Sequence, residues 1–374
     1  MASIKNSTSG ELYRITDARC ERSPGAPHEF YSEGDYWWPD PASESGLPYI
    51  KRDGLSNPDN FNEHRVLLMR MSRDVAELTL RYEKTGLIEH AVVACNILHS
   101  WFVAPETYMV PHLKYAQAIP GRCTGRGLGI IDTLHLAEAA LAVIRLDRLE
   151  TLNIELKKSL ERWFSEYLEW LISSEHGLSE KSQKNNHSTC WYLQVAAFAL
   201  LTDNRVVIEM CRNDYINILL SGQMASDGSF PLELERTKPY CYAIFNLEVM
   251  TALCQLLSDD NNNLFEAVTV DGLSIHDGIE FMYPYLFNKS SWPYVRDIMH
   301  WESWPNKQPC LLFSGLAYNE QKYLDLWNKM SVKERDFEAW RNTPVKNPEL
   351  WFNLYSTQMK TGQQEGCCAA GETD

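Results

Sequence analysis

Two short segments carry the side chains best suited to chemistry. The segment KNNHS holds Asn186 and His187, and the segment ERTKPYCY holds Arg236 and Tyr242. Amide and guanidinium groups can neutralise a carboxylate, while an imidazole and a phenol can carry protons. This set suits β-elimination from a uronate polymer, in which the C6 carboxylate is neutralised, the C5 proton is removed and the departing O4 is protonated. The residue types therefore predict Asn186 and Arg236 as charge-neutralising groups, and His187 and Tyr242 as proton carriers.

A tyrosine base needs a supporting charge, because an unperturbed phenol has a pKa near 10. Arg236 lies six positions before Tyr242, and its positive charge is expected to lower the pKa of that phenol. The residue types alone leave a second interpretation open. In that interpretation the asparagines cap a helix, His187 bonds buried backbone, and Arg236 is a solvated surface residue.

The elements that must position these residues are expected to be helices. Apolar residues recur at spacings of three and four, which is the period of a helix with one buried face, and strand-like alternation is rare. The sequence therefore predicts a mainly α protein of one domain, either an α/α toroid, which is an incomplete (α/α)n barrel, or a helical solenoid. The stretches expected to be helical span residues 68–82, 87–101, 130–144, 156–171, 208–218 and 242–256, and a further apolar helix is expected to begin at the KNNHS segment.

Long loops rich in Trp, Tyr, Pro, Asn and His separate the expected helices. Loops longer than about 12–15 residues are usually functional or disordered, and the aromatic content argues against disorder. Indole faces suit the apolar faces of sugar rings, so these loops are expected to gather around a cleft at one end of the toroid. The loops span residues 28–60, 104–129, 173–190, 222–241 and 287–310.

The domain boundaries follow from the same pattern. Residues 1–27 are expected to form an N-terminal extension, residues 28–359 the toroid, and residues 360–374 a flexible polar tail. No Pro/Ser-rich linker divides the middle of the chain, which favours one domain.

Composition excludes several classes of function. The 374 residues include 44% hydrophobic and 23% charged residues, and the formal net charge is −15. Such a chain can bury a large core, and its negative charge disfavours nucleic acid as a partner. The ten cysteines show neither CxxC pairs nor metal-finger spacing. No metal or cofactor is therefore expected.

Targeting signals are also missing from the sequence as written. The first twenty residues contain no apolar run of signal-peptide length, and no later stretch reaches about 18 uninterrupted apolar residues. The sequence predicts no membrane partner and a cytoplasmic location. The alternative is a secreted protein with an incomplete N-terminus.

Four co-linear blocks resemble the alginate-lyase superfamily. They are SEGDYWWPDP to NPDNFNEHR (residues 32–65), WFVAPETYMVPHLKYAQAIPGRCTGRGLGIID (101–132), KNNHSTCWYLQVAAFAL (184–200) and DGSFPLELERTKPYCYAIFNLEVM (227–250). The most similar branch is polysaccharide lyase family 38. The resemblance implies an α/α toroid and metal-independent β-elimination on β-1,4-glucuronan or alginate-like polyuronates, which leaves an unsaturated uronate end.

The resemblance also implies roles for individual residues. The histidine proton carrier of the family falls on His187, its arginine on Arg236 and its tyrosine on Tyr242. The helper asparagine directly precedes the histidine, which here means Asn186, although Asn185 is adjacent.

The second block departs from the family pattern. Ala104 stands where the family has an aspartate, and Val110 and His112 replace two asparagines. These changes concern substrate subsites more than proton chemistry. The side chains expected to contact the anionic polysaccharide are Asn185, Lys238, Tyr240, Trp37, Trp38, Tyr115, Arg126, Trp191 and Trp301.

Two other functions remain open at this point. A toroidal glycoside hydrolase would use two carboxylates across the bond, such as Glu233 with Glu235 or Asp35 with Asp40. A lyase-derived protein that binds polyuronates without cleaving them would keep the same residues, with its altered loop at residues 104–112 responsible for lost turnover.

Overall fold

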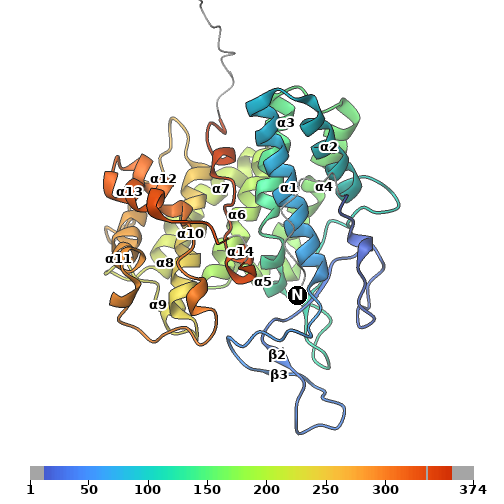
Figure 1. The fold of residues 1–374 in the computed structure, drawn as a ribbon, viewed down its shortest axis with the longest axis horizontal. Coiled ribbons are helices and arrows are strands. Elements are labelled where there is room, and N and C mark those ends of the chain that lie inside the picture. The colour runs from blue at the N-terminus through green and yellow to red at the C-terminus, as the bar shows by residue number, and fades with distance from the viewer. Residues whose placement is uncertain (1–11, 334–335, 356–374) are drawn as a thin grey trace, which may run out of the picture.

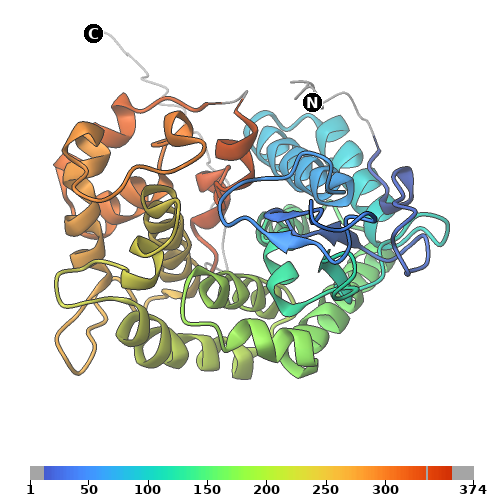
Figure 2. The same ribbon diagram turned by 90° about the horizontal axis from the view of Figure 1, so that it is seen from below.

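Helices dominate the chain and follow one another around an incomplete ring. The computed structural model describes residues 12–333 and 336–355, with its helices standing side by side (Figure 1). Figure 2 shows the chain passing around the ring from the blue N-terminal helices through green and yellow to orange. The expected mainly α toroid is confirmed. The helices are α1 (Glu63–Thr85), α2 (Ile88–Phe102), α3 (Leu136–Arg148), α4 (Ile154–Ser173), α5 (Glu175–Lys181), α6 (Asn186–Leu201), α7 (Arg205–Asp214), α8 (Ser221–Gln223), α9 (Pro231–Leu234), α10 (Pro239–Leu257), α11 (Ile275–Phe287), α12 (Pro309–Ala317), α13 (Gln321–Lys329) and α14 (Phe337–Arg341).

The apolar periodicity located these helices because one face of each packs into the core. All six stretches with that period are helical, and two of them change helix type along their length. Residues 130–144 divide between a 3-10 helix (Gly127–Thr133) and α3, and residues 208–218 pass from α7 into a π-helical turn (Tyr215–Leu220).

Helices α6 and α10 form the centre of the core and carry the site at their N-termini. They pack against each other, α6 also packs against α3 and α4, and α10 packs against α12. Both are apolar on nearly all sides and almost wholly buried, as expected of central helices. Helix α10 is long and apolar enough to cross a membrane, but 89% of that stretch is buried inside the protein. We therefore interpret α10 as a core helix.

Two regions differ from the sequence-based expectation. Residues 173–190, expected to be a loop, contain α5, which Ser174 caps by accepting a hydrogen bond from Gly177 N (3.0 Å). Its seven residues are too few for a helical period to be visible. Helices α11, α12 and α13 were not expected either. Pro284 interrupts α11, and α12 and α13 are nine residues each, so none gives a long regular stripe.

Short strands organise the loops at one end of the ring. Strand β1 (Tyr31–Glu33) pairs in parallel with β4 (Tyr115–Ala118), and β2 (Trp37–Trp38) pairs antiparallel with β3 (Ile50–Lys51). The β2–β3 loop projects below the helices in Figure 1. Two of the predicted aromatic loops, residues 28–60 and 104–129, are therefore held together by the β1–β4 pair.

The C-terminal segment closes the ring. Residues 336–355, in red, lie between the blue first helices and the orange last ones (Figure 2). Arg145 of α3 donates to the carbonyl of Phe352 (2.9 Å), and Glu138 accepts from the backbone of Lys346 and Asn347 (2.8 and 2.7 Å). These contacts fix the segment that follows α14 against α3.

The structure bears on the expected N-terminal extension but does not test the domain boundaries. Tyr13 and Ile15 belong to the main hydrophobic core, so part of the expected N-terminal extension packs with the toroid. The expected tail over residues 360–374 lies outside the described residues. The boundaries at residues 28 and 359 stay predictions.

One buried carboxyl group makes the stability of the toroid depend on pH. Glu248 of α10 is fully buried and accepts a hydrogen bond from Cys310 N (3.1 Å), at the start of α12. Burial raises its pKa from 4.5 to about 8. Because the pKa is higher in the folded state, the stability present at acid pH is lost as the pH rises from about 4.5 through about 8.

We therefore expect Glu248→Gln to increase the free energy of unfolding, relative to the wild type, progressively between pH 5 and pH 9. Glutamine keeps an acceptor for Cys310 N but carries no charge to bury. Urea denaturation followed by circular dichroism measures the difference. The same difference at both pH values would contradict this role for Glu248.

Candidate active site

The start of α6 holds two of the predicted residues. Asn185 caps the helix, and its side chain accepts a hydrogen bond from His187 N (3.3 Å). Asn186 is 2% exposed and donates to Glu233 through its backbone N (2.7 Å) and its amide nitrogen (2.8 Å to each carboxylate oxygen). Asn186 is thus fixed in place by a carboxylate from α9.

His187 is oriented by a buried glutamate. Its Nδ1 lies 2.7 Å from Glu180 Oε1, a residue of α5 with no exposed side-chain surface, while 18% of the His187 side chain is exposed. Burial raises the pKa of Glu180, and the neighbouring His187 opposes that rise. With Nδ1 facing Glu180, Nε2 is the ring nitrogen left for chemistry.

Glu180 is thus expected to act as a positioning residue. Glu180→Gln keeps the shape but removes the charge facing His187, so the imidazole loses its fixed orientation. We expect kcat to fall by more than about tenfold, but by less than the roughly 10²–10⁴-fold typical of a lost proton carrier. Steady-state kinetics measures this, with Glu175→Gln, an exposed residue of α5, as the matched control. Equal turnover in both variants would rule out the role.

Tyr242 lies between Tyr36 and Arg236. The hydroxyl oxygens of Tyr242 and Tyr36 are 2.5 Å apart, and Arg236 Nη2 lies 3.4 Å from Tyr242 Oη. The guanidinium carbon of Arg236 also lies 4.4 Å from the centre of the Tyr242 ring. Asp53 holds the same guanidinium at 3.3 Å. The predicted pairing of Arg236 with Tyr242 is therefore present, together with two partners from the β2–β3 region.

Burial dominates the ionisation of Tyr242. Desolvation raises the pKa of its phenol well above 10, Tyr36 adds to the rise, and Arg236 opposes it. The expected influence of Arg236 has the right direction, but burial outweighs it. The phenol is accordingly protonated in this state of the protein.

The loop that follows β3 packs closely against the segment that carries Arg236, and Gly54 makes the contact. Gly54 has φ +76°, and a Cβ atom at this position would lie 2.3 Å from Thr237 Oγ1. Thr237 in turn donates to Asp53 (3.0 Å). Only glycine permits this close approach with a left-handed backbone, so the loop that carries Asp53 is held against the segment that carries Arg236.

Glu233 connects the two predicted segments. Its carboxylate binds Asn186 directly, and both Arg236 and His187 stabilise its charge electrostatically. Burial nevertheless raises the pKa of Glu233 above its ordinary value. The structure therefore brings the residues of α6 and those at the start of α10 around one carboxylate, although they are far apart in the sequence.

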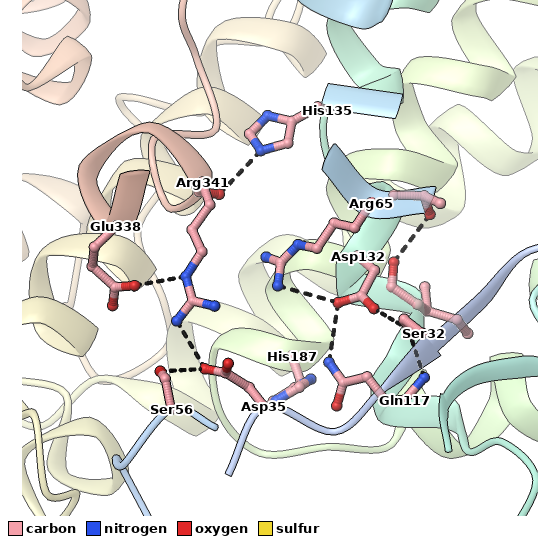
Figure 3. Close-up of polar contacts among 12 residues, drawn as sticks. Ser32, Asp35, Ser56, Arg65, Gln117, Asp132, His135, His187, Glu338 and Arg341 are labelled. Carbon is pink, nitrogen blue, oxygen red and sulfur yellow. Dashed lines mark hydrogen bonds and ion pairs between the residues drawn. The ribbon is translucent and has the colours of Figure 1, made fainter. Parts of the chain in front are cut away.

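A network of buried ion pairs borders the site. Arg341 of α14 binds Asp35 (2.8 Å) and Glu338 (2.6 Å), and Glu338 also binds Lys238 (2.8 Å). Figure 3 shows the Arg341 group and a second group around Arg65 on opposite sides, with His187 between them in this view. Because Asp35 precedes Tyr36 in the chain, this network holds the backbone that presents Tyr36 to Tyr242.

The second group is built on Asp132. Its carboxylate accepts from Ser32 (2.6 Å) and Gln117 (3.1 Å) and pairs with Arg65 (3.4 Å). The buried Nε of Arg65 has no hydrogen-bond partner in the described part of the chain. These contacts tie β1, β4 and α1 together beside His187.

Three of the residues expected to contact substrate lie in the core instead. Trp191 and Tyr240 are at most 1% exposed, and their polar atoms bond the carbonyls of Leu171 and Tyr285. Lys238 is also 1% exposed and paired with Glu338. These positions correct the prediction, because a buried and partnered side chain cannot contact a ligand in this state.

The other expected contact residues remain partly exposed. Trp37 lies under the guanidinium groups of Arg122 and Arg126, and Trp38 lies under Arg52. Asn185 serves as the helix cap described above. The residues that keep solvent-accessible surface are Asn185, Trp37, Trp38, Tyr115, Arg126 and Trp301.

Two of the four carboxylates proposed for a hydrolase are bound to other side chains, because Glu233 binds Asn186 and Asp35 binds Arg341. Glu235 is exposed, and Asp40 accepts a hydrogen bond from Ala42 N (2.9 Å). Within residues 12–333 and 336–355, no group of three or more His, Cys, Asp or Glu side chains is placed to hold a metal ion.

The helical toroid is the fold of a class of polysaccharide lyases, and here it carries an Asn–His pair at the start of α6 and an Arg–Tyr pair at the start of α10. The alginate lyase family matches residues 14–292. The chain belongs to this family.

Solved structures agree with the assignment. An alginate lyase from Bacteroides ovatus is 30% identical, with 89% of this chain and 88% of that one covered and a TM-score of 0.75. Alginate lyase A1-III from Sphingomonas species A1 is 16% identical, with 88% and 86% covered and a TM-score of 0.57, and supports the fold alone. A variant of A1-III complexed with a tetrasaccharide is also 16% identical, with 89% and 86% covered and a TM-score of 0.58. No curated protein matches the chain.

Proposed function

We propose that the protein cleaves a β-1,4-linked polyuronate, glucuronan or an alginate-like polymer, by β-elimination. The observation that carries this proposal is the contact of Tyr242 with both Arg236 and Tyr36. Arg236 and His187 both act electrostatically on Glu233. Family membership supports the reaction class. The similarity of the four sequence blocks to polysaccharide lyase family 38 supports glucuronan as a substrate, and the 30% identity to an alginate lyase from Bacteroides ovatus supports alginate.

In the proposed mechanism, Tyr242 carries both proton steps. In glucuronate and mannuronate the C5 proton and the O4 leaving group lie on the same side of the ring, so one group can serve as base and then as acid. The C5–H electron pair becomes the C4–C5 double bond, the C4–O4 bond breaks, and O4 takes the proton from Tyr242. His187 assists, and Arg236 neutralises the C6 carboxylate, whose charge delocalises in the transition state. Asn186 is buried and bonded to Glu233 in this state, so in this proposal its amide exchanges Glu233 for the substrate carboxylate.

Tyr242 must be deprotonated before it can accept the C5 proton, and burial raises its pKa. We therefore expect kcat/KM to rise with pH from neutrality into the alkaline range, because the deprotonated fraction of the free enzyme keeps growing. A pH profile on glucuronan measures this. A profile that levels off near neutrality, as an imidazole base would give, would assign proton abstraction to another group.

The experiment for substrate class compares three polymers. The protein is incubated with glucuronan, polymannuronate and polyguluronate, and the ultraviolet absorbance of the unsaturated uronate is followed. Glucuronan and polymannuronate are expected to react faster than polyguluronate, whose elimination needs base and acid on opposite faces. Preference for polyguluronate would contradict the roles given to Tyr242.

A further inference from the structure

A cavity lies outside the site of the proposed catalytic residues. Its volume is about 260 Å³, and its walls come from α1, the start of α12, α13, residues 332–333 and residues 340–348. It is therefore located where the first and last helices of the incomplete ring meet. None of the residues assigned to the reaction lines it. The side chains that matter for its chemistry are Lys307, Trp327, Lys333, Trp340 and Lys346.

The walls of the cavity carry three ammonium groups, and within the described ranges none of them forms a direct ion pair with a carboxylate. Glu138 acts on Lys346 only electrostatically, as Asp336 and Glu302 act on Lys333. Lys307 Nζ lies 4.4 Å from the centre of the Trp327 ring, and Lys333 Nζ donates to the Glu302 carbonyl (2.5 Å). Lys346 donates to the carbonyls of Trp340 and Thr343 (2.5 and 2.7 Å). Burial lowers the pKa of Lys346 to about 7. Lys346 Nζ also lies 3.4 Å from His135 Nδ1. A cation taken out of water is costly unless it is closely paired, so the lysines that lack a direct ion pair favour an anion in this cavity.

The one acidic wall residue is already engaged. Glu77 pairs with Arg73 (3.8 Å) and Arg81 (3.7 Å), and burial raises the pKa of its carboxyl group. Arg73 also pairs with Asp74 (2.6 Å). Glu77 is thus paired with arginines, whereas the cavity lysines have no ion pair within the described ranges.

Two tryptophans give the cavity apolar ring surfaces of the kind that bind sugars. Trp327 and Trp340 both line it, and indole rings can pack against the apolar face of a sugar ring. The Nε1 atom of Trp340 is buried and has no hydrogen-bond partner in the described part of the chain. A buried donor left unpaired is unfavourable, and a hydroxyl or carboxylate oxygen of a ligand would satisfy it.

We propose that this cavity binds a single uronate unit, with its carboxylate on the lysines and its ring against the tryptophans. Ligand pockets for drug-sized molecules span roughly 300–1,000 Å³, so a cavity of about 260 Å³ suits one sugar ring rather than a chain. The choice of uronate rests on the proposed function, because elimination releases uronate-ended products.

Helix α14 contributes residues both to the cavity and to the ion pairs beside the proposed catalytic residues. Trp340 lines the cavity, while Glu338 and Arg341 of the same helix bind Lys238 and Asp35 beside the catalytic residues. A product unit bound in the cavity would therefore contact the helix that supports Tyr36.

Isothermal titration of the full-length protein with sodium glucuronate tests the proposal. We expect binding that survives in Arg236→Ala, which disables the catalytic cleft, and that weakens by about tenfold or more in Lys307→Gln, which removes one ammonium group. Lys329→Gln, an exposed lysine of α13 outside the cavity, is the matched control and should bind like the wild type. Neutral glucose and inorganic phosphate should bind more weakly than glucuronate.

Unchanged affinity in Lys307→Gln, or loss of all binding in Arg236→Ala, would overturn the proposal. Phosphate binding as tight as glucuronate would reduce the cavity to a general anion site and overturn the uronate assignment. Circular dichroism establishes that each variant is folded. If glucuronate binds as expected but no polymer is cleaved, the proposed function fails while the cavity assignment stands, so the two failures are distinguishable.

Discussion

Replacing Tyr242 with phenylalanine is expected to lower kcat by about 10²–10⁴-fold on every polymer that the wild type cleaves, with little change in KM. The substitution removes only the hydroxyl that lies 2.5 Å from Tyr36 and 3.4 Å from Arg236. The ring that packs under Arg236 remains, so ground-state binding is preserved. Initial rates of unsaturated uronate formation measure the effect.

The matched control is Tyr240→Phe. Tyr240 lies two positions earlier in α10, is fully buried, and donates its hydroxyl to the Tyr285 carbonyl. This variant loses a buried hydroxyl from the same helix without touching the proposed chemistry, so its kcat should stay close to that of the wild type. Near wild-type turnover in Tyr242→Phe would exclude Tyr242 as the proton carrier.

Arg236→Ala is expected to damage both kcat and KM. The substrate carboxylate is charged in the ground state, so losing the guanidinium weakens binding, and its charge delocalises further as the C5 proton leaves, so turnover also falls. The variant additionally removes a positive charge that favours ionised Tyr242. We expect kcat/KM to fall by at least about 10³-fold, comparable to the loss of a preorganised charge-stabilising group.

A second arginine variant serves as a control, because it separates the local effect of Arg236 from the effect of changing the net charge of the protein. Arg205→Ala removes an arginine whose side chain is 85% exposed and paired only with Asp203, and its kinetics should match the wild type. Arg236→Lys keeps the charge but loses the planar contact with Tyr242, so an intermediate rate is expected. If Arg236→Ala changed KM alone, Arg236 would bind substrate without stabilising the transition state.

The sequence was sufficient to predict the long helices and the four proposed catalytic residues, but not the contacts that hold these residues in place. Asn186, His187, Arg236 and Tyr242 stand in long motifs that mark them directly. Tyr36 meets Tyr242 across 206 positions, and no local pattern encodes that contact. It could only have been suspected from its place in the SEGDYWWPDP block.

Glu180 was missed for a different reason. It lies on α5, a seven-residue helix in a region expected to be a loop, and too short to show a periodic pattern. Asp53 was missed because the turn at Gly54 that brings it to Arg236 depends on tertiary packing rather than on a recognisable motif.

The aromatic residues show where residue type misleads. Trp191 lies on α6 and Tyr240 on α10, helices that are apolar on nearly every side. In such helices the 3.6-residue period does not reveal which side chains face outward. Both rings pack inside the core, whereas Trp37 and Trp38, on a short strand outside the ring of helices, stay partly exposed.

The most direct measurement counts both products of each cleavage. Unsaturated uronate is followed by ultraviolet absorbance and new reducing ends by a colorimetric assay, on glucuronan, with the wild type and Tyr242→Phe. Elimination predicts one unsaturated end for every new reducing end in the wild type, and a parallel loss of both in Tyr242→Phe. New reducing ends without absorbance would reveal hydrolysis, and retention on a polyuronate column with neither product would reveal a binding protein; either result would contradict the account.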